Sequence, residues 1–398
     1  MLGAFQLRDL HRQDLLDDNA KIECHWIHAV SLGETKLAIE WIRHGSENGY
    51  LDSHIVFTTT IEDALNYFRS EALELKSPGH IYTSFFPLDF HWIQSAWIQR
   101  INPKDCFVME TDFWPSMLHI LKKNRIPSYL INGRISKSLC DYSTLVPGFT
   151  KSLLSSFQAM LVQYEEDRDR LELMGSTTVL PVGNAKFDLL QPQAMENQFL
   201  ELKRVCILPI IIYGSFHPDE WGVIEESYSH FPTGYLHIVV PRNPDQISEF
   251  LSQCETLDID VSVIKDPEEE IPYSGLVLLA RTGVLAALYQ IASIAVVGGS
   301  FNDVGGHNFV EPLLYKKVTI IGPNMRNFLR DALEFSSQGF VFQVENAVQV
   351  RQLIQKYDSN ARDMIEVSVK AFQYLSTKRG VIPKSWELVQ SCRTSLIA

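Results

Sequence analysis

The feature that most constrains the fold of this chain is the regular alternation of short apolar runs with amphipathic helical segments. The alternation extends from Ile22–Val30 to Pro127–Ile131 in the first half and restarts at Pro209–Gly214 in the second. Apolar runs of this length, separated by helices, are typical of parallel strands that are buried on both faces. Two such series predict an α/β protein built from two doubly wound parallel sheets whose carboxyl edges face one cleft.

A polar stretch separates the two series. Residues 191–198, QPQAMENQ, contain a proline and lie between two regular strand–helix patterns, as domain linkers commonly do. A length of 398 residues also favours two domains over one. We therefore predict a first domain at 1–190, a linker at 191–198 and a second domain at 199–398. The last helix, which follows a break near Gly380–Pro383, is expected to belong to the second domain or to return to the first.

Charge and cysteine spacing exclude several classes of protein. The net charge is −13 and both halves are acidic, which argues against nucleic acid as the main partner. The six cysteines show no CxxC spacing, so neither a structural zinc site nor another metal-ligand cluster is expected, and scattered thiols fit a reducing compartment. The sequence has no apolar run of about 18 residues, so it encodes no membrane span of its own.

Four predicted strands of the first half are followed by polar residues at their carboxyl ends: Glu34, Asp89, Glu110 and Arg134. Because the carboxyl ends of parallel strands share one edge of a sheet, these residues are expected to line a crevice. Glu34 falls in the first turn of a predicted helix, where it is either a dipole-stabilised carboxylate or a general base. Glu110 and Arg134 are interpreted either as an ion pair that orders the loops or as residues with a direct role.

The second half places glycines and hydrogen-bond donors at the corresponding edge. The stretch Ile294–Pro323 contains two predicted strands with two glycine pairs between them, followed by a helix start near Asn308. Glycines let backbone N–H groups approach a ligand closely, and a helix start attracts anions, so this stretch predicts a nucleotide site. A capping box between Asn308 and Glu311 is the alternative interpretation, and it is compatible with the first. The predicted donor-side residues are Ser215, His217, Arg242, Thr282, Gly283, Gly305, Gly306, Asn308 and Glu311.

Eight segments, in order, resemble one known family, the 3-deoxy-D-manno-octulosonic acid (Kdo) transferases of lipopolysaccharide synthesis. They span the chain from His28 to about Phe328. The segments are HAVSLGE at 28–34, METDFWP at 109–115, NGRIS at 132–136, GNAKFD at 183–188, SFHPDE at 215–220, PRNP at 241–244, VGGS at 297–300 and GGHNFVEP at 305–312.

This resemblance implies a GT-B fold with two Rossmann-like domains and an inverting glycosyl transfer in a Gram-negative bacterium. It implies CMP-Kdo as the donor and a lipid A precursor as the acceptor, with neither a metal nor another cofactor. By resemblance Glu34 corresponds to the catalytic base, Arg242 to the donor-phosphate arginine, and Glu311 points toward the ribose. Lys36, Asp89, Glu110 and Arg134 are predicted to serve the acceptor or to support the base.

A lipid acceptor implies a peripheral position at the cytoplasmic face of the inner membrane. The family usually begins with an apolar anchor, which is missing from this sequence. Lys36 and Arg43, with the aromatic residues between Phe85 and Trp97, are therefore the candidate membrane contacts. The alternative interpretation is a solvated helix face and ordinary core aromatics.

The sequence also departs from the family near the donor site. Asn243 replaces a usual histidine, Val284 replaces an acidic residue, and TTTIEDAL at 58–65 lacks the usual proline and glycine. Two other functions are therefore considered: a GT-B transferase that uses another nucleotide sugar, and a catalytically inactive relative that binds one.

Overall fold

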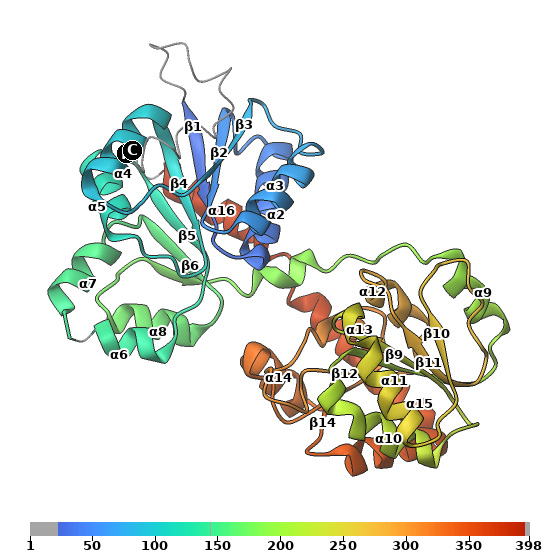
Figure 1. Ribbon diagram of the computed structural model, residues 1–398. Coiled ribbons are helices and arrows are strands. Elements are labelled where there is room, and N and C mark those ends of the chain that lie inside the picture. Colours follow the sequence, from blue (N-terminus) through green and yellow to red (C-terminus); the bar gives the residue numbers. More distant parts are fainter. Residues whose placement is uncertain (1–22, 144, 395–398) are drawn as a thin grey trace. The chain divides into compact units, whose positions relative to one another are not determined.

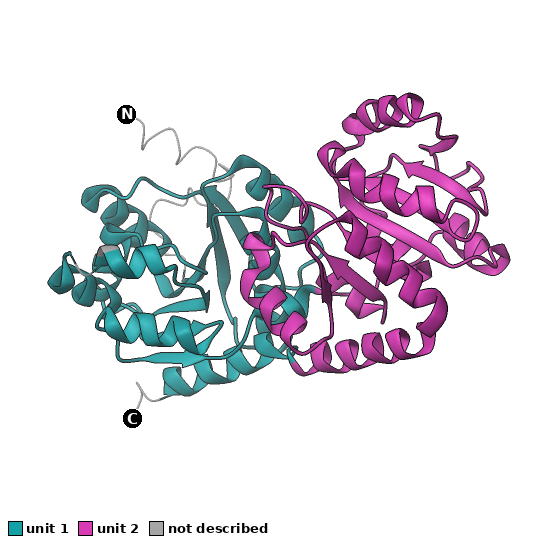
Figure 2. Ribbon diagram, turned by 90° about the horizontal axis from the view of Figure 1, so that it is seen from below, with its two compact units in different colours: residues 1–189, 378–398 teal, residues 190–377 magenta. Residues whose placement is uncertain are grey.

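The computed structural model describes residues 23–143 and 145–394. The chain divides into two compact units, which Figure 2 colours separately: unit 1 comprises Met1–Leu189 and Lys378–Ala398, and unit 2 comprises Leu190–Thr377. The first helix of unit 2 begins at Asn197, so the last two residues of the predicted linker are helical. The N-terminal stretch where the family's anchor would lie is outside the described residues.

The described part of unit 1 forms a seven-stranded parallel sheet in the order β3-β2-β1-β4-β5-β6-β7 (Figure 1). Its strands are β1 (Cys24–His28), β2 (His54–Thr59), β3 (Ile81–Phe85), β4 (Pro103–Met109), β5 (Ser128–Gly133), β6 (Ala159–Val162) and β7 (Val179–Pro181). Its helices are α2 (Leu32–Glu47), α3 (Glu62–Ala72), α4 (His91–Ile101), α5 (Pro115–Lys123), α6 (Lys137–Ser143), α7 (Pro147–Leu154), α8 (Glu165–Leu173), the 3₁₀ helix η1 (Ala185–Leu189) and α16 (Val381–Thr394).

Two cores cover the two faces of this sheet, because successive strand side chains point to opposite sides. On one face, Trp26 of β1 and Cys106 of β4 pack with side chains of α4 and α5. On the other face, Ile27 of β1 and Phe107 of β4 pack with side chains of α2, α3 and α16. The predicted doubly wound architecture is thus confirmed for this unit.

The described part of unit 2 repeats the architecture with the strand order β10-β11-β9-β8-β12-β13-β14. Its strands are β8 (Ile210–Phe216), β9 (Leu236–Pro241), β10 (Val261–Ile264), β11 (Gly275–Leu279), β12 (Ile294–Val297), β13 (Val318–Ile321) and β14 (Phe342–Gln343). Its α-helices are α9 (Asn197–Val205), α10 (Trp221–His230), α11 (Ile247–Thr256), α12 (Leu285–Leu288), α13 (Val310–Leu314), α14 (Leu329–Ser337) and α15 (Ala347–Thr377), which is interrupted at Asn360. Its 3₁₀ helices are η2 (Pro218–Glu220), η3 (Pro244–Gln246), η4 (Tyr289–Ile291) and η5 (Arg326–Phe328).

Helix α16 belongs to unit 1, and three kinds of contact hold it there. The Asp188 carboxylate accepts hydrogen bonds from the backbone N–H groups of Gly380 and Ile382 at the start of the helix. The Trp386 ring stacks on Trp41 with their centroids 4.1 Å apart. At the far end, the Arg393 guanidinium pairs with a buried aspartate of β4.

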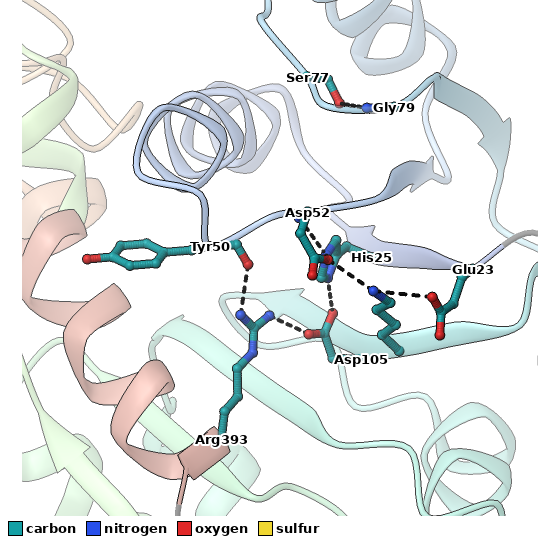
Figure 3. Close-up of polar contacts among 9 residues, drawn as sticks. Glu23, His25, Tyr50, Asp52, Ser77, Gly79, Asp105 and Arg393 are labelled. Atoms are coloured by element: carbon teal, nitrogen blue, oxygen red, sulfur yellow. Dashed lines mark hydrogen bonds and ion pairs between the residues drawn. The ribbon is translucent and has the colours of Figure 1, made fainter.

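Figure 3 shows this last contact at the amino edge of the sheet. Asp105 accepts a hydrogen bond from His25 Nδ1 (2.8 Å) and pairs with Arg393, which also donates to the Tyr50 carbonyl (2.8 Å). Because Asp105 is buried, these two cationic or polar partners are what make its charge tolerable there. The network therefore fixes the end of α16 against unit 1.

Helices α2 and α16 pack closely at Gly45. A Cβ at Gly45 would lie 2.5 Å from Trp386 Cζ2 and 3.0 Å from Leu51 Cγ. We expect Gly45→Ala to lower the free energy of unfolding by about 1–3 kcal/mol, the usual effect of overpacking a core. Alanine elsewhere in a helix gains roughly 0.5–1 kcal/mol over glycine. Gly222→Ala in α10, where nothing lies within 4 Å of the new Cβ, is the matched control for thermal denaturation and should raise the midpoint. A raised midpoint for Gly45→Ala would contradict the packing.

Candidate active site

Sheet topology brings the sequence-predicted residues of unit 1 together. The chain leaves β1 toward β2 on one side, whereas β4 pairs with β1 on the other side. This is the point where strand order reverses, and ligands of open α/β sheets bind beside the carboxyl ends of such strands. Glu34 follows β1 and Glu110 follows β4 directly, so both residues lie at this switch point.

Glu34 is held by hydrogen bonds to Ser31 and Val30 at the start of α2. Ser31 is the N-cap, and its hydroxyl accepts the Glu34 N–H (3.2 Å) and donates to Glu34 Oε1 (2.8 Å). The Val30 N–H donates to Oε2 (2.8 Å). Burial raises the pKa of the Glu34 carboxyl, the hydrogen bonds from Val30 and Ser31 oppose that rise, and the Glu110 charge adds to it. The carboxylate is therefore fixed in place, and it is more basic than the carboxylate of a solvent-exposed glutamate.

A hydrogen bond between His28 and Trp114 helps to hold the end of β1, which precedes this turn. His28 is fully buried, and its Nε2 accepts the Trp114 indole N–H (2.9 Å), so the hydrogen resides on Nδ1, which donates to the Thr58 carbonyl (3.1 Å). Burial lowers the pKa of His28 to about 3. This histidine is consequently neutral, and it positions the backbone rather than transferring protons.

Glu110 stands in a strained conformation and pairs with Lys186. Its φ is +57°, in the left-handed region, which costs a non-glycine residue roughly 1–3 kcal/mol. Lys186 Nζ lies 2.5 Å from Glu110 Oε1, and Asn132 donates to the same oxygen (3.4 Å). The predicted alternative of a Glu110–Arg134 ion pair is wrong, since the Arg134 side chain is exposed and Lys186 takes its place.

Two members of this group, Asp112 and Lys186, were not among the sequence-predicted site residues. Burial, followed by the charges of Glu34 and Glu110 and a hydrogen bond with Glu34, raises the pKa of Asp112 to about 7. Lys186 Nζ also lies 3.9 Å from where a Cβ on Gly33 would be, beside the start of α2. Both residues fall within the family-like segments METDFWP and GNAKFD, which was the available signal. Together the three carboxyl groups and the lysine can hold or release a proton near neutral pH.

The other residues predicted for unit 1 lie outside this cluster. The Asp89 carboxylate accepts the backbone N–H groups of Ser116 (3.0 Å) and Met117 (2.9 Å), so it caps α5. Arg134 contributes its carbonyl to the Thr111 hydroxyl (2.8 Å). Lys36 is exposed on α2, and its Nζ lies 5.5 Å from the centroid of the Tyr67 ring.

Unit 2 has its own switch point, between β8 and β12. These strands pair directly, with Gly214 opposite Val297, and β9 lies on the other side of β8. Ser215, at the end of β8, has φ +58°, and a Cβ on Gly298 would lie 2.5 Å from the Ser215 carbonyl oxygen. The two chain segments therefore touch backbone to backbone, which explains why a glycine follows β12.

Glu220 holds the two segments together, and sequence reasoning did not single it out. Its buried carboxylate accepts three backbone N–H groups, from His217 (3.0 Å), Gly299 (2.8 Å) and Phe301 (3.0 Å). Burial raises the pKa of Glu220, and these hydrogen bonds oppose the rise. The acidic residue at the end of SFHPDE is thus structural, since it joins the loop after β8 to the loop after β12.

The glycine loop forms a tight turn beside this joint. Gly305 and Gly306 have φ +100° and +82°, and their N–H groups both donate to the Gly299 carbonyl. The predicted N-cap at Asn308 is wrong by one residue: Phe309 occupies the N-cap position of the short helix α13 and makes no side-chain capping hydrogen bond. Asn308 precedes it, and its Oδ1 accepts the Val310 N–H (3.1 Å). In place of the predicted capping box, the Asn308 side-chain amide donates to the Glu311 carboxylate (3.0 Å).

The cationic groups of unit 2 differ in their availability. The Arg281 guanidinium pairs with Glu196 (2.7 Å), whereas Thr282 and Gly283 beside it are exposed. Arg242, which follows β9, is exposed, and in the described residues its side chain has no ion-pair partner. The guanidinium of Arg242 is therefore available to an anion. Among the described residues, no group of three or more histidine, cysteine, aspartate or glutamate side chains is placed to hold a metal ion.

Comparisons with known proteins agree on a family. Residues 7–189 match the family model described as 3-deoxy-D-manno-octulosonic-acid transferase (kdotransferase). The 3-deoxy-D-manno-octulosonic acid transferase of Aquifex aeolicus (strain VF5) is 26% identical over 82% of this chain and 83% of that protein. The bifunctional glycosyltransferase/methyltransferase of Fusobacterium nucleatum is 26% identical over 89% of this chain, which spans only 55% of that protein.

Solved structures support the fold. The crystal structure of a glycosyltransferase from Rickettsia africae ESF-5 matches 94% of this chain and 99% of its own chain, with a TM-score of 0.60 at 13% identity. The arrangement of two parallel-sheet units is the GT-B fold. Among the described residues, no helix combines the length and the apolar character needed to cross a membrane.

Proposed function

Because the chain belongs to the 3-deoxy-D-manno-octulosonic acid (Kdo) transferase family, a family of glycosyltransferases, we propose that it transfers Kdo from CMP-Kdo to a lipid A precursor with inversion. The observation that carries the proposal is the Glu34 carboxylate, which is held at the carboxyl end of β1 by two hydrogen bonds and made more basic by burial. A carboxylate in this state suits a general base for a sugar hydroxyl.

Each unit contributes a different part of the reaction. Glu34 of unit 1 takes the hydroxyl proton of the acceptor while the acceptor oxygen forms a bond to the anomeric carbon of Kdo. The bond from that carbon to the phosphate oxygen breaks, and CMP leaves with the electron pair. In unit 2, the Arg242 guanidinium stabilises the phosphate as its charge grows. Lys186 balances the negative charge around Glu34.

The test is incubation of the protein with CMP-Kdo and a tetraacylated lipid A precursor, with the products counted by mass. The expected result is a gain of one or more Kdo masses that depends on both substrates. Reactions with UDP-sugars in place of CMP-Kdo, and reactions without any nucleotide sugar, are run in parallel as controls. Turnover of a UDP-sugar with none of CMP-Kdo would replace the proposed donor, and CMP binding without any turnover would favour an inactive relative.

The pH dependence of kcat/KM should reveal the ionisation of the Asp112 carboxyl group. Its proton is held below pH 7 and released above it, because burial and the Glu34 charge raise its pKa to about 7. Ionised Asp112 adds negative charge beside Glu34 and so strengthens it as a base. We expect kcat/KM to rise through a step near pH 7 in the wild type, and this step to vanish in Asp112→Asn. Asp63→Asn on the exposed start of α3 is the control, and persistence of the step in Asp112→Asn would contradict the assignment.

A lipid acceptor also requires contact with a membrane, and we infer that unit 1 provides it as a peripheral protein at the cytoplasmic face of the inner membrane. Two of the aromatic candidates, Phe86 and Trp97, are buried in the core and are excluded. Phe90 and Trp92 are 50% and 68% exposed, and their rings stack 5.1 Å apart. Arg43 is half-buried and paired with Glu40, so Lys36 is the more available basic residue.

Flotation with anionic vesicles tests this contact. Inserting each aromatic ring partly into the interface contributes on the order of 1 kcal/mol, so a Phe90→Ser/Trp92→Ser variant, which loses both rings, should bind roughly 30-fold more weakly. Lys36→Glu should reduce binding at low salt only, because salt screens exposed charges. Leu173→Ser removes an equally exposed apolar side chain from α8 and should have no effect. Unchanged flotation of the double aromatic variant would rule out this surface.

A further inference from the structure

Two histidines from distant parts of the chain meet at the switch point of unit 2. His217 follows β8, and His307 follows the glycine loop after β12. Their Nε2 atoms are 2.9 Å apart, the ring centroids are 5.2 Å apart and the ring planes differ by 17°. A nitrogen–nitrogen distance of 2.9 Å is a hydrogen bond, so one Nε2 carries a hydrogen and the other accepts it. Two hydrogens cannot occupy that space.

The backbone prevents the rings from separating. The Glu220 carboxylate accepts the N–H groups of both His217 and Gly299, which fixes the two loops relative to each other. The His307 N–H donates to the Gly298 carbonyl (3.1 Å), and a Cβ on Gly299 would lie 2.8 Å from His307 Nε2. The His307 ring therefore rests directly on the backbone that Glu220 holds, and the pair is preformed.

The surroundings disfavour the addition of a further proton to this pair in the absence of a ligand. Burial, followed by the positive charges of Arg242 and His217, lowers the pKa of His307 to about 4. The nearby carboxylates are engaged elsewhere: Glu220 with three N–H groups, Asp219 with the Asn302 side chain (3.0 Å) and Glu311 with the Asn308 side chain. The Arg242 guanidinium, which has no ion-pair partner among the described residues, acts on His307, while the Glu220 carboxylate interacts with His217.

We propose that His217 and His307 share one hydrogen between their Nε2 atoms in the free protein, and that the pair takes up one further proton, on a ring nitrogen outside this hydrogen bond, when a phosphate dianion such as that of CMP lies beside Arg242. The inference rests on the proposed function, because it assigns the phosphate to this unit. A dianion next to Arg242 cancels the positive charge that opposes protonation, and it favours an imidazolium next to it. The proton comes from solvent, and no covalent bond to either histidine is formed.

This proton has a use in the transfer reaction. The donor phosphate carries one negative charge while it is esterified to the sugar and gains a second when the bond to the anomeric carbon breaks. A proton on the histidine pair offsets that second charge. Proton uptake is therefore expected to accompany binding of CMP, which carries both charges, and not binding of cytidine, which has no phosphate.

Calorimetry in buffers of different ionisation enthalpy measures the protons taken up on binding. At pH 7–8, where the CMP phosphate is already mostly a dianion, we expect the wild type to take up a substantial fraction of one proton with CMP and none with cytidine. The CMP dissociation constant should accordingly rise with pH, by at most about tenfold per pH unit for one linked proton. His307→Gln keeps a hydrogen-bonding group near the Nε2 position but cannot be protonated, so it should bind CMP without proton uptake and with a flat pH dependence.

His230→Gln is the matched control, because His230 is exposed on α10 and bonds only within its own helix. It should behave as the wild type does. CMP binding by the wild type without proton uptake, or equal uptake by His307→Gln, would overturn the histidine proposal and leave the proposed function standing. Absence of CMP binding in the wild type and in His230→Gln would overturn the proposed donor, and this inference with it.

Discussion

Replacement of Glu34 by glutamine is expected to lower kcat by about 10²–10⁴-fold, the usual contribution of a general base. The variant keeps the shape of the side chain and can still form hydrogen bonds at the start of α2, since glutamine serves near a helix start as glutamate does. The Val30 N–H and the Ser31 hydroxyl therefore retain partners, and unit 1 should remain folded. Only the ability to accept the hydroxyl proton is lost. The rate is measured with CMP-Kdo and the lipid A precursor at saturation.

Two further measurements separate chemistry from structure. The CMP dissociation constant should be unchanged in Glu34→Gln, because the donor groups belong to unit 2. Glu62→Gln removes a carboxylate from the first turn of α3, where the side chain is exposed, and should leave kcat unaltered. Near-normal turnover by Glu34→Gln would remove this residue from the mechanism, and equal losses in both variants would indicate a general effect of charge.

The elements that could be predicted from the sequence are those whose residues are buried on both faces. The predicted runs Pro127–Ile131 and Pro209–Gly214 agree with β5 and β8 to within two residues at each end, because uninterrupted apolar runs leave little freedom of assignment. Glu34 could be placed at a strand–helix turn for a similar reason, since the apolar run of β1 ends where the helical period of α2 begins.

The contacts within the site could not be predicted, because they depend on strand order. Nothing local to Glu110 indicates that Lys186 is its partner, as the lysine is brought there only when η1 follows β7 at the sheet's carboxyl edge. The predicted partner of Glu110, Arg134, is nearer to it in sequence and directly follows the neighbouring strand β5. In the same way, the role of Glu220 depends on the pairing of β8 with β12.

The error at Asn308 has a local cause. Asparagine is a favoured N-cap and was assigned that role, but its side chain accepts the N–H two residues on, which forms a turn before the helix rather than starting it. The helix α13 that follows has only five residues, and the N–H groups of Gly305 and Gly306 before it donate to the Gly299 carbonyl, so the predicted anion site at a helix start is not formed by these groups.

Arg242→Ala is expected to weaken CMP binding by about 1.5–3 kcal/mol, roughly 10- to 150-fold in the dissociation constant, if one charge-assisted hydrogen bond to the phosphate is lost. The guanidinium is exposed and has no ion-pair partner among the described residues, so its removal leaves no buried charge behind and the loss should appear in binding, not in stability. Arg242→Lys should recover only part, because a single ammonium replaces a planar fork. Arg204→Ala on α9, which removes an exposed arginine paired with Glu201, is the calorimetric control. Equal CMP affinity in wild type and Arg242→Ala would assign the phosphate to other groups and would also remove the charge that the histidine pair is proposed to sense.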